Sequence, residues 1–548
     1  MESDRHGDRP LPTAAHPPTG HRSSAIPSRQ PSVRPTGASA ATPARDQGVV
    51  SAALGYGYTI ASTLVGLLLT PFVIGALGDA QYGVYLLIGS LITALTLVDL
   101  GLGNAVTRFV ARYRAAGDLE GEGRFNALVA KLYLAIALLV LAGGWAATGQ
   151  VDRWFAGGLD PAEADTARTL FAILVVNLAV MLPNGALTAL CMARQHFIWP
   201  RATLIARLAL RVVLVLAILS GGGGAVALAL IDTGLNIALL AANIFYVVRR
   251  LRPAWTPASF DPALARRILG YSGWIFLFVI VGKLQWNVGQ LILGARVDAV
   301  AVAIYGVGIM LGTFYAGFGS AVSQLMLPKA ATLVEQGANP RVLTDMMIAS
   351  GRANLLLLFP VLAGFALYGR LFMDLWVGPA YASAYWIALL VMLAYTLPLV
   401  QSFANALLEA YGLFAFKALA YLVPITIGYV IGTMLLPRDG MIGLAAWSIG
   451  GWMVGQALVN IYYSRRLQLG LMRFFAATLL RLLPLFGLTL AAGLLFDRLL
   501  PGGWAGLAAR TVLLVFTYVA LALAVGIDAG ERSALREALP VRRRHVRS

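Results

Sequence analysis

The sequence predicts an all-α polytopic membrane protein with about fourteen transmembrane helices. From Gly48 onward, long apolar runs alternate with short polar breaks, and a helix needs about 20 apolar residues to cross a bilayer. The chain is 59% hydrophobic and only 12% charged, whereas ordinary soluble domains are about 25% charged. Lys and Arg concentrate in every second break, which is typical of cytoplasmic loops.

The apolar segments divide the chain into two bundles of six helices and two additional C-terminal helices. We expect the bundles over residues 49–250 and 251–466, and the final pair over 467–527. The individual segments are 50–76, 84–107, 127–149, 167–190, 201–220, 225–248, 268–293, 300–327, 351–373, 384–408, 417–436, 441–464, 474–496 and 506–527.

Both ends of the chain are predicted to be cytoplasmic. Residues 1–48 are rich in Pro, Ser, Arg and Thr, and such a segment buries too little apolar surface to offset the entropy of ordering. It is therefore expected to be a disordered tail, and it is not a signal peptide because no apolar stretch precedes a cleavage site. Residues 528–548 form a second, basic tail.

Composition also restricts the partners and cofactors. The net charge of +17 is spread over membrane-flanking loops, so anionic membrane lipids, and not nucleic acid, are the expected partners. Cys191 is the single cysteine, which excludes an intramolecular disulfide and a multi-cysteine metal site. The five histidines show no metal-ligand spacing, and no cofactor is expected.

A weak internal repeat relates the two halves. Tyr82-Gly83-Val84 matches Tyr305-Gly306-Val307, and Pro183 in the fourth segment has a counterpart in Pro398 in the tenth. Both matches keep a six-segment offset, as in transporters whose site lies between two repeated halves. The alternative is that Tyr-Gly after a polar break is only an interfacial anchor.

The stretch 70–118 resembles the opening of bacterial Wzx-type polysaccharide flippases, a family within the multidrug/oligosaccharidyl-lipid/polysaccharide exporter superfamily. The matching positions are Thr70-Pro71, Leu77-Gly78, Tyr82-Gly83, Asp99-Leu100-Gly101, Asn104-Ala105 and Arg108. The resemblance implies two bundles around a central cavity in the bacterial inner membrane. It also implies that an undecaprenyl-diphosphate-linked oligosaccharide is flipped to the outer leaflet for exopolysaccharide, capsule or O-antigen synthesis, with the pathway's polymerase and chain-length regulator as further candidate partners.

Cationic side chains within the apolar segments are the first candidate site residues, because a charge at membrane depth usually faces a cavity or a partner. Lys283 lies near the middle of its segment, and Asn287 and Gln290 extend a polar face from it. The functional interpretation is an ammonium that meets a diphosphate or an acidic sugar. The alternative is a structural ion pair with a neighbouring helix.

A second polar face combines arginines and carboxylates. Arg207 and Arg211 are four residues apart and share one face of the fifth helix, where a guanidinium suits bidentate phosphate binding. Either could instead be a positive-inside anchor. Asp99 and Asp232 are candidates for binding or titrating with a coupling ion. The alternatives are pairing with Arg211 or a nearby arginine, or hydrogen bonding at a glycine-loosened turn.

A third set is expected to line the inward-facing mouth. Gln401 and Asn405 share a face of the tenth helix, and Arg352 begins the ninth. For Arg352 the alternative is an anchor to inner-leaflet headgroups.

Two other functions compete with the flippase. A multidrug/cation antiporter of the same superfamily needs acidic groups in its cavity, whereas Arg211 and Lys283 favour an anionic substrate. A membrane polymerase or glycosyltransferase usually carries a sizeable external loop, and the breaks here are short. No G-x-x-x-x-G-K-[ST] phosphate loop is present. We therefore expect a transporter that is not an enzyme and that uses the membrane potential or an ion gradient.

The charge asymmetry predicts the topology. Of the 42 Lys and Arg residues, 33 lie in cytoplasmic segments, two at mid-membrane and seven in external breaks. The external seven are Arg153, Arg168, Arg296, Arg370, Arg438, Arg498 and Arg510. A periplasmic phosphatase reporter fused after Gly157 should be active, and the same reporter fused after Arg466 should be inactive. The reverse pattern would contradict this topology.

Overall fold

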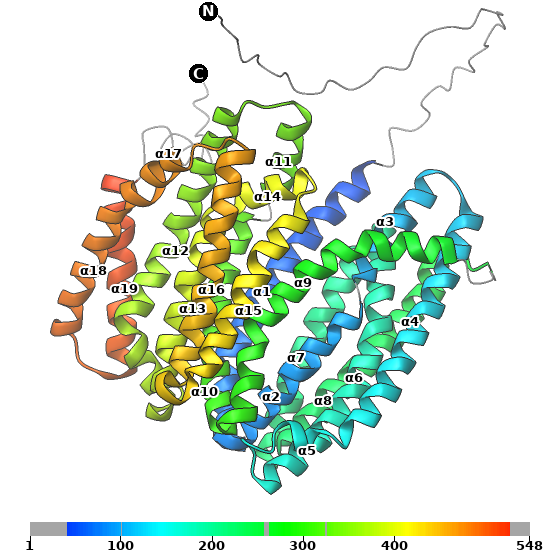
Figure 1. The fold of residues 1–548 in the computed structure, drawn as a ribbon, viewed down its shortest axis with the longest axis horizontal. Coiled ribbons are helices and arrows are strands. Elements are labelled where there is room, and N and C mark those ends of the chain that lie inside the picture. Colours follow the sequence, from blue (N-terminus) through cyan, green and yellow to red (C-terminus); the bar gives the residue numbers. More distant parts are fainter. Residues whose placement is uncertain (1–40, 100, 257–261, 324–325, 527–548) are drawn as a thin grey trace, which may run out of the picture. The chain divides into compact units, whose positions relative to one another are not determined.

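The computed structural model describes residues 41–526, except 100, 257–261 and 324–325. These residues form helices and turns and contain no strand (Figure 1). The predicted all-α class is confirmed. A helix satisfies its backbone hydrogen bonds internally, which a segment in hydrocarbon requires.

The N-terminal half runs from α1 to η2. Its elements are α1 (Ala41–Leu77), α2 (Asp79–Leu95), η1 (Thr96–Asp99), α3 (Leu102–Ala115), α4 (Leu119–Thr148), α5 (Val151–Trp154), α6 (Pro161–Ala193), α7 (Ile198–Ser220), α8 (Ala225–Tyr246) and η2 (Val247–Leu251).

The C-terminal half begins with α9 and is followed by the final helices. Its elements are α9 (Pro262–Arg296), α10 (Ala299–Ser323), α11 (Met326–Glu335), α12 (Pro340–Trp376), η3 (Pro379–Tyr381), α13 (Ala382–Val400), α14 (Ser402–Ala410), α15 (Phe414–Met434) and α16 (Leu436–Arg466). The final helices are α17 (Leu471–Phe475), η4 (Ala476–Leu480), α18 (Arg481–Leu499), α19 (Gly503–Leu521) and η5 (Ala522–Gly526).

The helices correspond to the predicted segments. Among the described residues, thirteen spans are long and apolar enough to cross a membrane. The remaining predicted segment, 268–293, coincides with α9, a helix of 35 residues. The first helix, α1, begins at Ala41, before the expected end of the tail at residue 48. Residues 1–40 and the predicted basic tail 528–548 lie outside the described residues.

The segments 84–107 and 384–408 were each predicted as one continuous helix, and each is broken within the described residues. The segment 84–107 becomes α2, η1 and α3, and Gly101 between them has φ 72°, a conformation that glycine adopts without a Cβ clash. The segment 384–408 becomes α13 and α14, which meet at Gln401. Pro398 lies just before this break, and its carbonyl oxygen accepts a hydrogen bond from Asn405 Nδ2 at 3.1 Å.

The two halves meet where α2 packs against α9 and α10 (Figure 1). A Cβ on Gly83 would lie 1.8 Å from the carbonyl oxygen of Ala299, and a Cβ on Gly306 would lie 2.6 Å from Cδ1 of Leu86. Gly83 and Gly306 are the glycines of the two Tyr-Gly motifs. Close approach of helices at small residues is the usual way to gain packing energy in a bilayer, so these glycines bring the halves together.

This contact predicts a selective sensitivity of α2 to substitution. Gly83→Ala should destabilise the protein by about 1–3 kcal/mol, because overpacking forces the backbones apart. Gly89→Ala is the matched control in the same helix, because nothing lies within 4 Å of its Cβ position. Unfolding midpoints in detergent measure the difference. Equal midpoints for the two variants would contradict the close contact.

Candidate functional site

A cavity of about 650 Å³ lies between the two halves. Its walls come from α2, α6, α7 and α8 on one side and from α9 and α10 on the other. Its polar lining residues are Tyr82, Tyr85, Ser90, Thr93, Asn177, Arg207, Arg211, Asp232, Asn236, Asn287, Gln290 and Thr313. The cavity therefore combines residues that are more than two hundred positions apart in the chain.

An ion pair between α7 and α8 lines the N-terminal side of this cavity. Arg211 Nε lies 2.6 Å from Asp232 Oδ1, and Arg211 Nη2 lies 3.2 Å from Asp232 Oδ2. This is the bidentate geometry that a guanidinium offers to a carboxylate or a phosphate. The Tyr85 hydroxyl donates to Asp232 Oδ2 at 2.9 Å. The short glycine-rich turn 221–224 places α7 and α8 side by side, and this brings Arg211 close to Asp232.

A second arginine shares the same carboxylate. Arg207 lies four residues before Arg211 on α7, and its Nη2 is 3.9 Å from Asp232 Oδ1. Its Nε has no hydrogen-bond partner. In the described lining there are thus two guanidinium groups for one carboxylate. The excess positive charge and the unsatisfied donor favour an anionic ligand. No group of three His, Cys, Asp or Glu side chains in the described residues is placed to hold a metal ion.

The opposite wall is polar but less charged. Asn287 and Gln290 of α9 line the cavity, and the Ser90 hydroxyl of α2 donates to Gln290 Oε1. Lys283 lies one turn before Asn287, whose Nδ2 bonds to the Lys283 carbonyl oxygen at 3.1 Å. The Lys283 side chain is half-buried and is not among the lining residues. Of the predicted site residues, five line this cavity and Lys283 adjoins it.

Two other predicted charged residues lie elsewhere. Asp99 accepts a hydrogen bond from the Tyr133 hydroxyl at 2.9 Å, at the break between α2 and α3. Arg352 is only 4% exposed, and its Nη2 donates to the carbonyl oxygen of Gly526 at 2.9 Å. The structure therefore places Arg352 between α12 and the last helices.

The predicted amides of the tenth segment also have partners within the C-terminal half. Gln401 is fully buried, and its Oε1 accepts a hydrogen bond from Gln456 Nε2 at 2.5 Å. Asn405 accepts from the Tyr463 hydroxyl at 2.9 Å. Gln456 and Tyr463 both belong to α16, so this polar face is turned to a neighbouring helix.

Sequence reasoning missed part of the lining. Asn177 of α6 accepts a hydrogen bond from Asn236 Nδ2 at 2.5 Å, and a lone amide in the apolar run around it is a signal that was available. Tyr85 and Trp286 carry no comparable signal, because aromatic residues are also common at membrane interfaces.

Comparison with known proteins supports this architecture. The profile of the polysaccharide biosynthesis protein family matches residues 47–334. The fold is similar to a lipid II flippase MurJ in an inward closed conformation, with TM-score 0.69, 12% identity, and 86% of this chain and 98% of that chain covered. It is also similar to an inward-facing multidrug resistance MATE transporter of the MOP superfamily, with TM-score 0.53, 15% identity, and 75% and 96% covered. At these identities the structural likeness shows the fold alone. No curated protein matches the chain.

The ion pair predicts strong coupling between Arg211 and Asp232. Arg211→Gln and Asp232→Asn should each destabilise the protein, and the double variant should lose less than the sum, with a coupling of about 0.5–3 kcal/mol. The control cycle uses Arg124 and Glu120, which are paired at the surface, where a coupling of about 1 kcal/mol or less is expected. Denaturant unfolding in mixed micelles measures both cycles. Additive losses at Arg211 and Asp232 would show that the pair does not form.

Proposed function

The chain belongs to the polysaccharide biosynthesis protein family. We propose that it flips a lipid-linked oligosaccharide across the bacterial inner membrane. The proposed substrate is an undecaprenyl-diphosphate-linked oligosaccharide, moved from the inner to the outer leaflet for exopolysaccharide, capsule or O-antigen synthesis. The fold shared with a lipid II flippase supports this proposal.

The observation that carries the proposal is the cationic cavity. Two guanidinium groups face one carboxylate, and a diphosphate supplies the oxygens that a bidentate arginine prefers. Asp232 holds Arg211, which avoids an unpaired charge at membrane depth. A substrate phosphate that enters the cavity takes the place of the carboxylate at Arg211 and uses the free Nε donor of Arg207.

Binding of the anion also involves the other half. Asn287 and Gln290 supply amide groups on the α9 wall, and Lys283 lies one turn before Asn287 on the same helix. Contacts from both walls to one headgroup favour closure of the halves around the substrate. Asp99 and Asp232 are the proposed carboxylates for coupling to an ion gradient or the membrane potential, with both termini in the cytoplasm.

The runner-up is a multidrug/cation antiporter, supported by the fold shared with a MATE transporter. A cationic drug needs an available acid, but the Asp232 carboxylate is engaged by Arg211 and Tyr85. A membrane polymerase or glycosyltransferase has less support, because the break between α4 and α6 contains only the short α5.

The proposal predicts the effect of removing the charges. Lys283→Ala and Arg211→Ala should each reduce polymer export while the protein remains in the membrane. Arg211→Lys should restore only part of the export, because an ammonium cannot make the bidentate contact. Arg438→Ala is the control, because that side chain is 85% exposed. The measurement is complementation of export in a strain that lacks the gene, with abundance followed by immunoblot.

Wild-type export by both alanine variants would refute the anionic cavity, and loss of both from the membrane would identify structural ion pairs. Expression in a drug-sensitive strain distinguishes the antiporter from the flippase. Drug resistance without complementation of export would favour the antiporter.

A further inference from the structure

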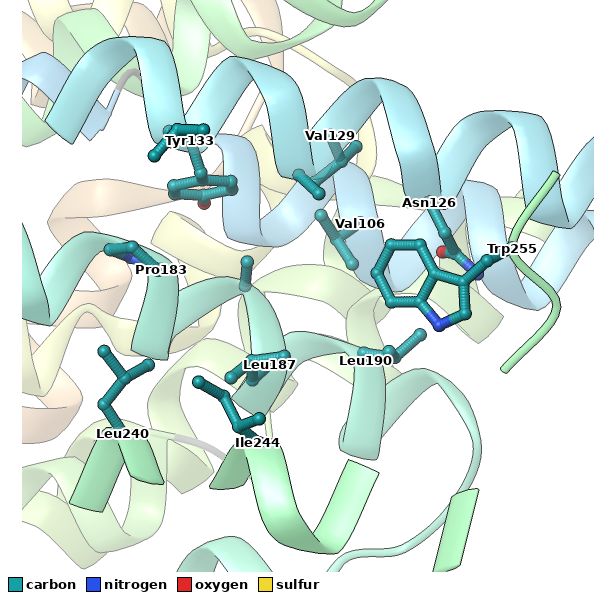
Figure 2. Close-up of a pocket in the computed structure, with 13 residues that line it drawn as sticks. Val106, Asn126, Val129, Tyr133, Pro183, Leu187, Leu190, Leu240, Ile244 and Trp255 are labelled. Carbon is teal, nitrogen blue, oxygen red and sulfur yellow. The ribbon is translucent and has the colours of Figure 1, made fainter. Parts of the chain in front are cut away.

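A second cavity, which we call the apolar slot, lies within the N-terminal half (Figure 2). Its volume is about 240 Å³, and its walls come from α3, α4, α6 and α8 and from the segment after η2. Figure 2 shows branched apolar side chains along its length. Its lining residues include Asn126, Ala130, Tyr133, Leu134, Pro183 and Trp255. Nothing in the flippase proposal uses this cavity.

The depth of the slot matches one leaflet. On α4 it extends from Asn126 to Leu134, a length of about 12 Å. One leaflet contributes about 15 Å of hydrocarbon. On the topology that the charge asymmetry predicts, this is the inner leaflet, because α4 begins at its cytoplasmic end. Leu134 is 60% exposed and Ile244 is 47% exposed, so the slot is open sideways to the bilayer.

One end of the slot carries an interfacial aromatic residue. Trp255 lies beside Asn126 at that end, away from Pro183 and Leu240 (Figure 2). Asn126 Nδ2 donates to the carbonyl oxygen of Ala254 at 3.1 Å, which fixes the segment that carries Trp255. Tryptophan is enriched at headgroup level. An occupant of the slot would therefore have its polar end near Trp255 and its apolar chain along α4.

The same end of the molecule is basic. Three exposed arginines, Arg249, Arg250 and Arg252, directly precede Trp255 in the chain. The buried acid Glu122 is already paired with Arg194. Burial lowers the pKa of His196, and the charges of Arg194, Arg114 and Arg250 lower it further, so the local potential is positive. An anionic headgroup complements this end, and a neutral one does not.

We propose that the apolar slot binds one acyl chain of an anionic phospholipid of the inner leaflet, with its phosphate held near Arg249, Arg250 and Arg252. The chain packs against Tyr133, whose hydroxyl bonds Asp99 at the α2–α3 break, and against Pro183 inside α6. The lipid chain therefore lies beside the α2–α3 break and beside the proline inside α6.

The experiment uses the full-length protein in phosphatidylethanolamine vesicles with a phosphatidylglycerol that carries a photoreactive group in its acyl chain. Peptides from residues 126–134 should be labelled. Excess unlabelled phosphatidylglycerol should compete several-fold better than phosphatidylcholine. Ala130→Phe fills the slot and should reduce labelling several-fold. Ala135→Phe should not, because Ala135 is an exposed alanine of the same helix that does not line the slot.

A second pair of variants tests the headgroup. Arg249→Gln with Arg250→Gln should abolish the preference for phosphatidylglycerol over phosphatidylcholine. Arg465→Gln with Arg466→Gln, two exposed arginines at the end of α16, should leave the preference unchanged.

Three outcomes would overturn the proposal. Equal competition by both phospholipids would show unselective annular lipid. Competition by a polyprenyl phosphate and not by phosphatidylglycerol would assign the slot to the substrate's chain. Labelling that Ala130→Phe leaves unchanged would place the lipid elsewhere. The competition experiment on the unmodified protein decides the question even where Ala130→Phe fails to fold.

Discussion

The cost of an unpaired polar group in hydrocarbon determines how this protein is built. An arginine at the centre of a membrane helix costs about 2.5–3.5 kcal/mol on insertion scales, and every backbone amide must find an internal partner. The described residues satisfy their backbone amides by forming helices. The Arg211 side chain is paired with Asp232, which also accepts a hydrogen bond from the Tyr85 hydroxyl. The polar cavity is the result of these two demands.

Beside the cavity, glycine lets α2 approach α10 closely. Gly83 leaves no room for a Cβ against Ala299, and Gly306 leaves little against Leu86. Both glycines follow a tyrosine, and Tyr82 lines the cavity directly beside this contact. Leu86 and Gly306, which pack together where the halves meet, are thus also lining residues of the cavity. A substitution at this contact is therefore expected to change the cavity wall as well.

The sequence predicted the helices and the cationic wall well, but it did not predict which polar faces point inward. Hydropathy and charge depend on local composition, so the spans and Arg207, Arg211 and Asp232 could be identified. Gln401 showed the same four-residue spacing as Arg211, yet it faces Gln456 of α16. The choice between a cavity and a neighbouring helix depends on tertiary packing. A glycine-loosened turn beside Asp99 was one alternative in the sequence, and Gly101 directly precedes α3 there. The full break could not be predicted, because a glycine in an apolar run is also common in continuous membrane helices.

The two cavities share helices, and this has a mechanical consequence. On α6 and α8, Asn177 and Asp232 line the polar cavity, and Leu187 and Leu240 line the apolar slot. Pro183 lies between these groups on α6. Proline removes one backbone hydrogen bond and is a point at which a helix bends. On the two proposals made above, the substrate headgroup and the lipid chain would contact the same two helices, α6 and α8, at different depths. We therefore expect the occupancy of one cavity to alter binding in the other through Pro183, which lines the slot.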